Sequence, residues 1–275
     1  VSGKAPTPKC KMVNGRPAPM KFELAKGVDL ELEGCPAGNF EMGYKDGNKA
    51  SRLHRVKITR PFWLGKYLVT RRQWMSMMGK KDMTAVQQAL GGLNAAVDGI
   101  AIDDMIEFCK KMNQKFAGKL PRGYVFRFPT EAEWEYACKA NAYDVYSMVK
   151  MKDNLDEIGV HWEHPLRKAF FAKQNLKWDG YLGTRTPVTV GLCKPNAWGF
   201  YDMTFNCWQV LLDVLEPGVD RNAKIEQKRF VELVYDAEET DPVMVSSSPA
   251  ACRMMRGYSK WLDERVEVVS SKGDL

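Results

Sequence analysis

The sequence predicts an α+β fold with sparse regular secondary structure. Helical periodicity and capping signals concentrate between residues 70 and 139, whereas residues 141–200 are rich in Asn, Asp, Gly and aromatic side chains with few long periodic stretches. Helices grouped in one part of a chain and irregular β structure in another are typical of the α+β class. The 275 residues suffice for one large core, and 45% hydrophobic with 27% charged residues excludes a disordered chain.

The N-terminal part predicts a leader followed by short strands. Residues 1–20 hold Pro, Gly and Lys without periodicity, so we interpret them as a flexible leader preceding one domain over residues 21–275. Apolar residues alternate on both sides of Lys26-Gly27 between residues 22 and 32, which predicts a β-hairpin. Residues 40–43 and 56–58 indicate two further strands.

Four helices follow. Thr70 and Gln73 predict a capping box at the start of the first, which Gly79 ends. The second covers residues 83–90. The third starts near Asp103 and ends before Gly118, with four side chains at helical spacing on its core face: Ile106, Cys109, Met112 and Phe116.

Thr130 and Glu133 predict another capping box at the start of the fourth helix, where Trp134 and Ala137 supply a buried face. A short helix is also expected near residues 225–234. No internal repeat is visible.

The charge distribution excludes some partners. The net charge is +7, and residues 1–80 hold 16 Lys and Arg against 6 Asp and Glu. These basic residues are scattered among apolar strand positions without a nucleic-acid motif, which favours a solvated surface over nucleic-acid binding. No apolar stretch approaches the roughly 20 residues of a membrane span, so no span is predicted. The compartment stays open.

Cysteine and histidine usage argues against a disulfide framework and against zinc. Seven widely spaced cysteines without a Cys-x-x-Cys pair favour small buried hydrophobes, and only three histidines are present. His161 and His164 flank Trp162-Glu163 and could bind a metal, but surface or packed histidines in a loop are the favoured interpretation.

Five segments in order resemble the formylglycine-generating, sulfatase-modifying family. They cover roughly residues 35–275 and are Phe40-Glu41-Met42-Gly43 with His54-Arg55-Val56, residues 61–70 (PFWLGKYLVT), residues 127–137 (RFPTEAEWEYA), residues 195–203 (PNAWGFYDM) and residues 256–261 (RGYSKW). The last is a weakened form of the family's Arg-Gly-Gly-Ser-Trp. The resemblance implies a C-type-lectin-like α+β fold.

The resemblance also defines what the chain lacks. Aerobic enzymes of this family oxidise a substrate cysteine to formylglycine with a copper ion held by two cysteines near the C-terminus. Thiolates are soft ligands that select Cu(I). The stretch after Ser259 holds neither cysteine nor histidine, and Glu267 or Val268 falls where the first ligand would lie. We therefore expect no copper, and we expect a pseudoenzyme rather than an enzyme.

Two calcium loops of the family have counterparts of different quality. In one, four residues supply oxygen donors, and a metal site or an ordinary Asx-rich turn both stay open: Asn175, Leu176, Asp179 and Tyr181. In the other, Asp202 keeps a carboxylate while Gln209 replaces the family's Glu. Because calcium affinity follows ligand charge, we expect that second site to be weak or empty, with Gln209 hydrogen-bonding the loop.

Three functions stay open at this point. The first is a non-catalytic module that binds a peptide, protein or glycan through the groove its relatives use for substrate. The residues expected to contact the ligand are Trp198, Tyr258, Lys260, Trp261, Glu264 and Glu267; for Trp198, core packing is the alternative. The second function is cysteine oxidation with rearranged ligands. The third is a display protein diversified by a retroelement, suggested by the departures from the family pattern in residues 258–273.

Overall fold

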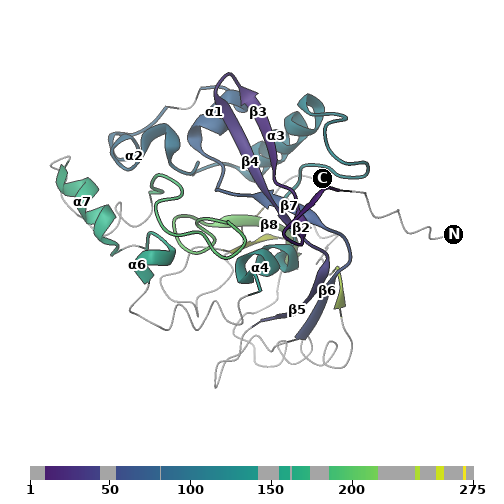
Figure 1. The fold of residues 1–275 in the computed structure, drawn as a ribbon. Coiled ribbons are helices and arrows are strands. Elements are labelled where there is room, and N and C mark those ends of the chain that lie inside the picture. Colours follow the sequence, from purple (N-terminus) through teal and green to yellow (C-terminus); the bar gives the residue numbers. More distant parts are fainter. Residues whose placement is uncertain are drawn as a thin grey trace.

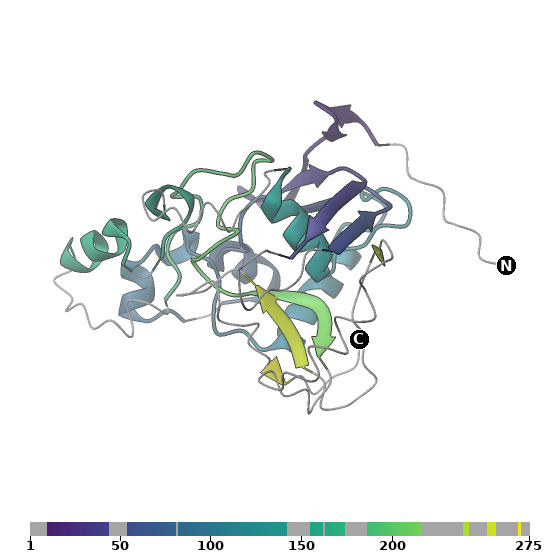
Figure 2. The same cartoon turned by 90° about the horizontal axis from the view of Figure 1, so that it is seen from below.

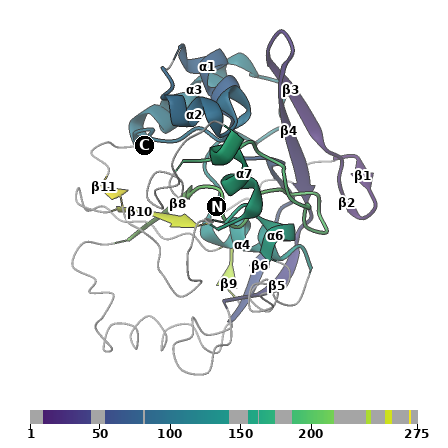
Figure 3. The same cartoon turned by 90° about the vertical axis from the view of Figure 1, so that its left-hand side faces the viewer.

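A computed structural model gives the fold, and it describes residues 10–43, 54–80, 82–141, 155–161, 163–173, 186–215, 239–241, 252–256 and 269–270. Short helices and small, mainly antiparallel sheets confirm the predicted α+β class. Figures 1 and 3 show helices α1, α2 and α3 at one end of the molecule and strands β5 and β6 at the other. Within the described residues, no helix is long and apolar enough to cross a membrane.

The predicted hairpin forms two strands of the first sheet. Strands β3 (Met20–Ala25) and β4 (Val28–Cys35) are antiparallel, and β7 (Phe62–Gly65) pairs with the other side of β4. Gly27 closes the turn at φ +70°, a conformation that glycine adopts without strain. The alternating side chains of β3 place Phe22 and Leu24 in the core.

The prediction of a flexible leader over residues 1–20 is wrong from Met12 onward, where the chain forms strands. Strands β1 (Met12–Val13) and β2 (Arg16–Pro17) form a second hairpin, in which Asn14 and Gly15 both have positive φ. An Asn-Gly pair favours this turn, and the sequence interpretation overlooked it. Arg16 Nη1 then donates to the Trp198 carbonyl at 2.7 Å, which ties the hairpin to the domain. Residues 1–9 lie outside the described part.

The second sheet joins β5 (Gly38–Met42), β6 (His54–Ile58) and β9 (Glu239–Thr240). The strands expected at residues 40–43 and 56–58 correspond to β5 and β6, which are antiparallel, whereas β9 is parallel to β6. The helix expected near residues 225–234 falls outside the described residues.

The third sheet brings the C-terminal part back to the middle of the chain. Its order is β11 (Val269–Ser270), β10 (Cys252–Arg256) and β8 (Gln209–Leu215), all antiparallel. Figure 2 shows β10, in yellow, alongside the green β8. β10 ends at Arg256, so this sheet fixes the position of the residue that precedes Gly257.

Both predicted capping boxes are confirmed. Helix α1 (Arg71–Met78) begins after Thr70, whose hydroxyl accepts from the Gln73 amide while the Gln73 side chain accepts from the Thr70 amide. Helix α4 (Glu131–Lys139) begins after Thr130 with the same exchange to Glu133. Each box satisfies two amides that a helix N-terminus otherwise leaves without a partner.

The other two predicted helices differ in detail. Helix α2 (Ala85–Ala89) is shorter than expected, because Thr84 and Gln87 form a third capping box inside the predicted span. Helix α3 (Ile102–Lys115) follows the short 3-10 helix η1 (Gly92–Asn94). On α3, Ile106, Met112 and Phe116 are buried as predicted, Phe108 is buried with them, and Cys109 is only half-buried.

Two helices lie where irregular structure was expected. Helices α6 (Leu155–Ile158) and α7 (Pro165–Lys173) extend from one side of the domain in Figure 1. Neither has the long apolar periodicity by which helices are recognised in a sequence. Residues 186–200, later in the same predicted stretch, are turns and loops as predicted.

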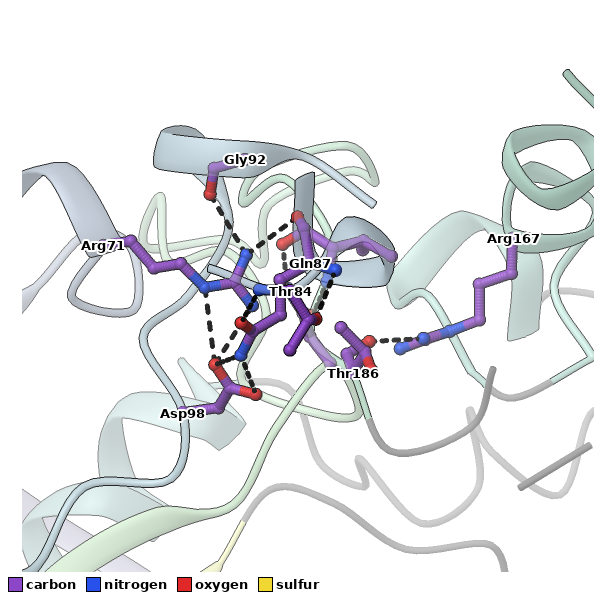
Figure 4. Close-up of polar contacts among 9 residues, drawn as sticks. Arg71, Thr84, Gln87, Gly92, Asp98, Arg167 and Thr186 are labelled. Atoms are coloured by element: carbon purple, nitrogen blue, oxygen red, sulfur yellow. Dashed lines mark hydrogen bonds and ion pairs between the residues drawn. The ribbon is translucent and has the colours of Figure 1, made fainter. Parts of the chain in front are cut away.

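Two buried arginines donate to backbone carbonyls of neighbouring segments, as Figure 4 shows. Arg71 on α1 lies 3.0 Å from the Asp98 carboxylate and donates to the carbonyls of Gln87 and Gly92. Arg167 on α7 is fully buried and donates to the Thr186 carbonyl at 2.7 Å. A guanidinium carries five donors, so one side chain can satisfy several loop carbonyls that helices and sheets leave unpaired.

The core has two main parts. One packs α4 and strands β5 and β6 around Trp134, Tyr136 and Trp198, whereas the other packs α1 and α3 against the β3–β4 hairpin. Tyr136 and Trp198 meet edge to face with ring centroids 4.9 Å apart. The first part supports the N-terminus of α4 and the strands β8 and β10.

Candidate ligand-binding site

The last residue of β10 is tied to the start of α4. Arg256 Nε donates to Glu131 Oε1 at 2.8 Å, its Nη2 also contacts this oxygen, and Nη2 lies 3.6 Å from Glu135 Oε2. The side chains of Arg256 and Glu131 are only 23% and 13% exposed. Because water solvates these two charges poorly, removal of either one should destabilise the protein more than removal of one charge from an exposed ion pair.

Glu131 belongs to a cluster of acidic side chains around Arg256. The Glu131 amide donates to Asp213 Oδ2 on β8 at 2.6 Å, Glu135 accepts from the Gly43 amide at 2.6 Å, and Lys139 lies 2.8 Å from Glu135. We call Glu131, Glu135, Asp213, Lys139 and Arg256 the Arg256 cluster. Burial raises the pKa of Glu131, although Arg256 opposes this shift. The cluster joins α4, β8 and β10 at the point where residue 257 follows.

Most of the predicted ligand contacts lie beyond this point. Tyr258, Lys260, Trp261, Glu264 and Glu267 fall outside the described residues, so their assignment stays a prediction. Trp198 is only 5% exposed and packs against Tyr136, with the Arg16 guanidinium 5.8 Å from its ring. Its side chain therefore belongs to the core, which was the alternative to lining a groove.

The side-chain amide of Gln209 closes the loop from Asp202 to Gln209 by hydrogen bonds to backbone carbonyls. Gln209 Nε2 donates to the Asp202 carbonyl at 3.0 Å and to the Met203 carbonyl at 3.5 Å, while Gln209 Oε1 accepts from Trp134 Nε1 at 2.9 Å. The amide of Gln209 thus faces two carbonyl oxygens with its donor end. A cation would have to displace this NH₂ group to reach them.

The Asp202 carboxylate is also engaged within the protein. It accepts from the Gly191 amide at 2.7 Å and from Asn206 Nδ2 at 3.3 Å, and the residue is only 4% exposed. Burial raises the pKa of Asp202, and these two hydrogen bonds oppose the shift. A loop with one buried carboxylate and an amide NH₂ in place of a second carboxylate does not suit calcium, which takes six to eight oxygen ligands.

The other predicted calcium loop cannot be placed. Asn175, Leu176, Asp179 and Tyr181 fall outside the described residues, so calcium at that loop stays a prediction. The described part of the chain contains no group of three or more His, Cys, Asp or Glu side chains arranged to hold a metal ion.

His161 and His164 meet around Asp156, a partner the sequence interpretation missed. His161 Nε2 lies 2.6 Å from Asp156 Oδ1, and His164 Nε2 lies 3.0 Å from the Asp156 carbonyl. Each Nδ1 accepts a backbone amide, from Glu163 and Leu166 respectively, so the ring proton belongs on Nε2. Both nitrogens of each ring are engaged, which agrees with packed histidines rather than with metal ligands.

Five of the free thiols have a pKa that burial raises above the ordinary value: Cys35, Cys109, Cys138, Cys193 and Cys207. Burial raises the pKa of Cys109 and Cys193 to about 11 and that of Cys138 and Cys207 to about 12. Cys193 Sγ lies 3.9 Å from His164 Nε2, but that nitrogen already donates to Asp156. Copper(I) needs thiolates. Each of these four thiols would have to lose its proton at a position where burial raises its pKa before it could hold the ion.

The sequence interpretation missed the Arg256 cluster, although a signal for it exists. Glu131 and Glu135 belong to the motif at residues 127–137, and Arg256 opens the motif at residues 256–261. Two characteristic segments with opposite charges suggest a contact. The length of chain between them hides it, since Arg256 and Glu131 are 125 positions apart.

This fold and site define an α+β domain of C-type-lectin-like architecture, with a charged anchor for the strand that precedes the C-terminal segment. The chain belongs to the sulfatase-modifying factor enzyme 1-like family, whose model matches residues 33–269.

Individual relatives are distant. The chain is 27% identical to the Chaperone protein LppX of Paenibacillus barcinonensis over 194 residues, which are 59% of this chain and 67% of that protein. It is 26% identical to the formylglycine-generating enzyme of Mus musculus over 189 residues, or 69% of this chain. That match spans only 44% of the mouse enzyme.

A solved structure supports the fold. The Treponema denticola variable protein 1 aligns with a TM-score of 0.61 at 18% identity, and the alignment covers 88% of each chain.

Proposed function

We propose that this protein is a non-catalytic member of its family that binds a peptide, protein or glycan with the segment following Arg256. The observation that carries the proposal is the Arg256 cluster, which holds the end of β10 through a poorly solvated ion pair. A rigid scaffold that presents an adjoining segment is the usual arrangement of a binding loop. Aromatic and charged residues in that segment, such as Lys260 and Trp261, suit a binding surface.

The chemistry of the thiols supports the non-catalytic part. Residues 257–275 contain no cysteine and no histidine. The thiols of Cys138 and Cys207 have pKa values raised to about 12 by burial, so neither offers a thiolate near neutral pH. A protein ligand is further supported by the relative that is named a chaperone protein.

A copper(I) titration tests the non-catalytic part. With a competing chelator, we expect no stoichiometric site tighter than the competitor, and incubation of a Cys-x-Pro-x-Arg peptide with oxygen should leave the peptide mass unchanged. Tight one-to-one copper binding together with loss of cysteine from the peptide would establish the second function, oxidation of a sulfatase cysteine.

Peptide and glycan arrays probed with the whole chain test the binding part. A ligand found in this way should lose affinity on Trp261→Ala or Lys260→Ala, because interface aromatic and basic residues contribute most to binding. The variant Lys194→Ala is the matched control, since Lys194 is an exposed lysine that pairs with Glu157 on α6. A ligand whose affinity is unchanged by both C-terminal substitutions contradicts the proposal.

Two observations support the third function, a diversified display protein. The chain resembles in fold a protein that is named variable, and residues 258–273 depart from the family pattern. If this chain is a diversified display protein, the neighbouring genomic region should carry a reverse transcriptase and a template repeat of this segment. Their absence from the region excludes this version and leaves the binding proposal intact.

A further inference from the structure

Strand β3 forms an edge of the first sheet. The sheet order is β3, β4, β7, so β3 pairs with β4 on one side and, among the described residues, with no strand on the other. Figure 3 shows the β3–β4 hairpin along one side of the molecule, with β3 continuing into β2. An edge strand presents backbone donors and acceptors with which another extended segment can pair.

The hydrogen bonds of β4 show which residues of β3 face outward. The Glu31 carbonyl accepts from the Lys66 amide, which follows β7, so the Glu31 backbone groups point toward β7. Lys21 lies opposite Glu31, and in an antiparallel pair opposite residues either exchange both hydrogen bonds or neither. Lys21 therefore points its amide and carbonyl away from β4, and Glu23, in the same register, does the same.

The outer edge borders a groove of about 350 Å³. Six residues of β3 and of the chain at the end of α3 line it: Met20, Lys21, Phe22, Glu23, Phe116 and Lys119. Phe22 and Phe116 pack edge to face with centroids 5.0 Å apart, which gives the groove an apolar floor. The Lys115 ammonium donates to the Leu24 carbonyl at the register shift between Glu23 and Ala25, so α3 already contacts this end of the strand.

The rim of the groove is basic. Lys115 and Lys119 are exposed, and no ion pair of either is found within the described residues. Glu23 accepts from the Gly27 amide and keeps its charge, and Lys21 pairs with Asp29 at 2.7 Å, so three lysines (Lys21, Lys115, Lys119) against two carboxylates (Glu23, Asp29) leave the rim with a net charge of +1. This balance favours an acidic ligand. It disfavours a second copy of this chain, which would bring the same lysines against these.

We propose that the outer edge of β3 binds an extended acidic segment of a partner protein, which joins the sheet as a fourth strand beside Lys21 and Glu23. Main-chain hydrogen bonds to the two outward residues give affinity, and alternate side chains of the segment reach the floor at Phe116 and the amine of Lys119. The site lies on β3 and α3, so it does not depend on the ligand proposed for the C-terminal segment.

The test is an anisotropy titration with a labelled peptide of about six residues in which Glu and Val alternate, the usual length of a strand. We expect saturable binding below about 1 mM that weakens as salt is added. A peptide with Gln in place of Glu should bind less tightly. Equal binding of the Gln peptide, or no saturable binding by the wild type, overturns the proposal.

Two variants separate the charge from the backbone. Lys119→Glu should weaken binding about fivefold, since one exposed attraction becomes a repulsion. Lys21→Pro removes an outward amide that an edge strand does not need, and should weaken binding about three- to tenfold. Lys21→Ala keeps the amide and should have a smaller effect than Lys21→Pro. Lys168→Glu, on α7, is the matched charge control and should bind like the wild type.

Thermal unfolding of each variant shows whether it folds. If Lys21→Pro does not fold, Lys119→Glu and the Gln peptide decide the question. Wild-type affinity in folded Lys119→Glu and Lys21→Pro overturns the proposal. So does a concentration-dependent dimer in sedimentation that Lys21→Pro alone converts to a monomer, because the edge then binds a second copy.

Discussion

Arg256 and Glu131 join the last residue of β10 to the first residue of α4 across 125 positions of sequence. The Glu131 amide in turn donates to Asp213 on β8, so one residue contacts two of the three strands of this sheet, β8 and β10. Because the carboxylates of this cluster are poorly solvated, each depends on its partner for stability. The ion pair is therefore both a structural element and the support of the candidate site.

Removal of the Arg256 guanidinium should lower the free energy of unfolding far more than removal of the cation from an exposed ion pair. Arg256→Met leaves Glu131 as a buried carboxylate without its cation, and we expect a loss of about 3 kcal/mol in the free energy of unfolding. Lys194→Met, which breaks an exposed pair with Glu157, should cost less than about 1 kcal/mol. Urea unfolding measures both. Equal losses in the two variants would show that the Arg256 pair has no special role.

The raised pKa of Glu131 predicts a pH dependence of stability. Because the folded state holds the proton more tightly than the unfolded state does, this group stabilises the fold below its unfolded pKa. That contribution is lost as the pH rises through the folded pKa. Urea unfolding from about pH 4 to pH 7 should show a contribution that falls with pH in the wild type and is missing in Glu131→Gln. Identical pH profiles contradict the assignment.

The sequence predicts the local structure of this chain better than its long-range contacts. Thr70 with Gln73 and Thr130 with Glu133 are capping boxes in the structure as predicted, because a box depends on residues three apart. The Lys26-Gly27 turn is confirmed for the same reason. The Asn14-Gly15 turn carried an equally local signal, and it was missed because the surrounding residues lack periodicity.

The candidate site depends on contacts that no local pattern contains. Asp156 meets His161 and His164 because α6 and the following loop fold back, and Glu131 meets Arg256 because two distant motifs share one sheet. Helix α7 has little apolar periodicity and is fixed by the buried Arg167, an interaction that hydrophobic patterns do not predict. Sequence reasoning therefore identified the motifs but not how they connect.

The amide of Gln209 predicts how the protein responds to calcium. The Asp179→Ala variant, in which the other predicted calcium loop is disabled, should keep its thermal stability when a chelator or calcium is added, because the Gln209 amide already satisfies the Asp202 and Met203 carbonyls. Gln209→Glu turns a carboxylate toward these oxygens, so this variant should be less stable in chelator and should regain stability with calcium. An Asp179→Ala protein that loses stability in chelator contradicts this prediction.

A Gln209→Ala variant tests, without any metal, whether this side chain holds the loop from Asp202 to Gln209 closed. Gln209→Ala removes the partners of Trp134 Nε1 and of the Asp202 carbonyl, and we expect a loss of about 1–3 kcal/mol for buried groups left unpaired. Gln87→Ala is a suitable comparison, since Gln87 contributes to an exposed capping box and also binds Asp98. Denaturant unfolding measures both, and a neutral Gln209→Ala would mean that the loop closes without this side chain.

Alkylation of the cysteines tests whether their thiols are protonated and buried in the native protein. Because Cys35 and Cys138 are buried and burial raises the pKa of both thiols, both should resist iodoacetamide in the native protein near neutral pH and react after unfolding. Cys10, which is partly exposed near the N-terminus, serves as the internal control and should be alkylated first. Peptide mass spectrometry over a time course resolves the sites. Rapid native labelling of Cys138 would reveal an accessible thiolate on α4 and would revive the case for a thiol-based activity.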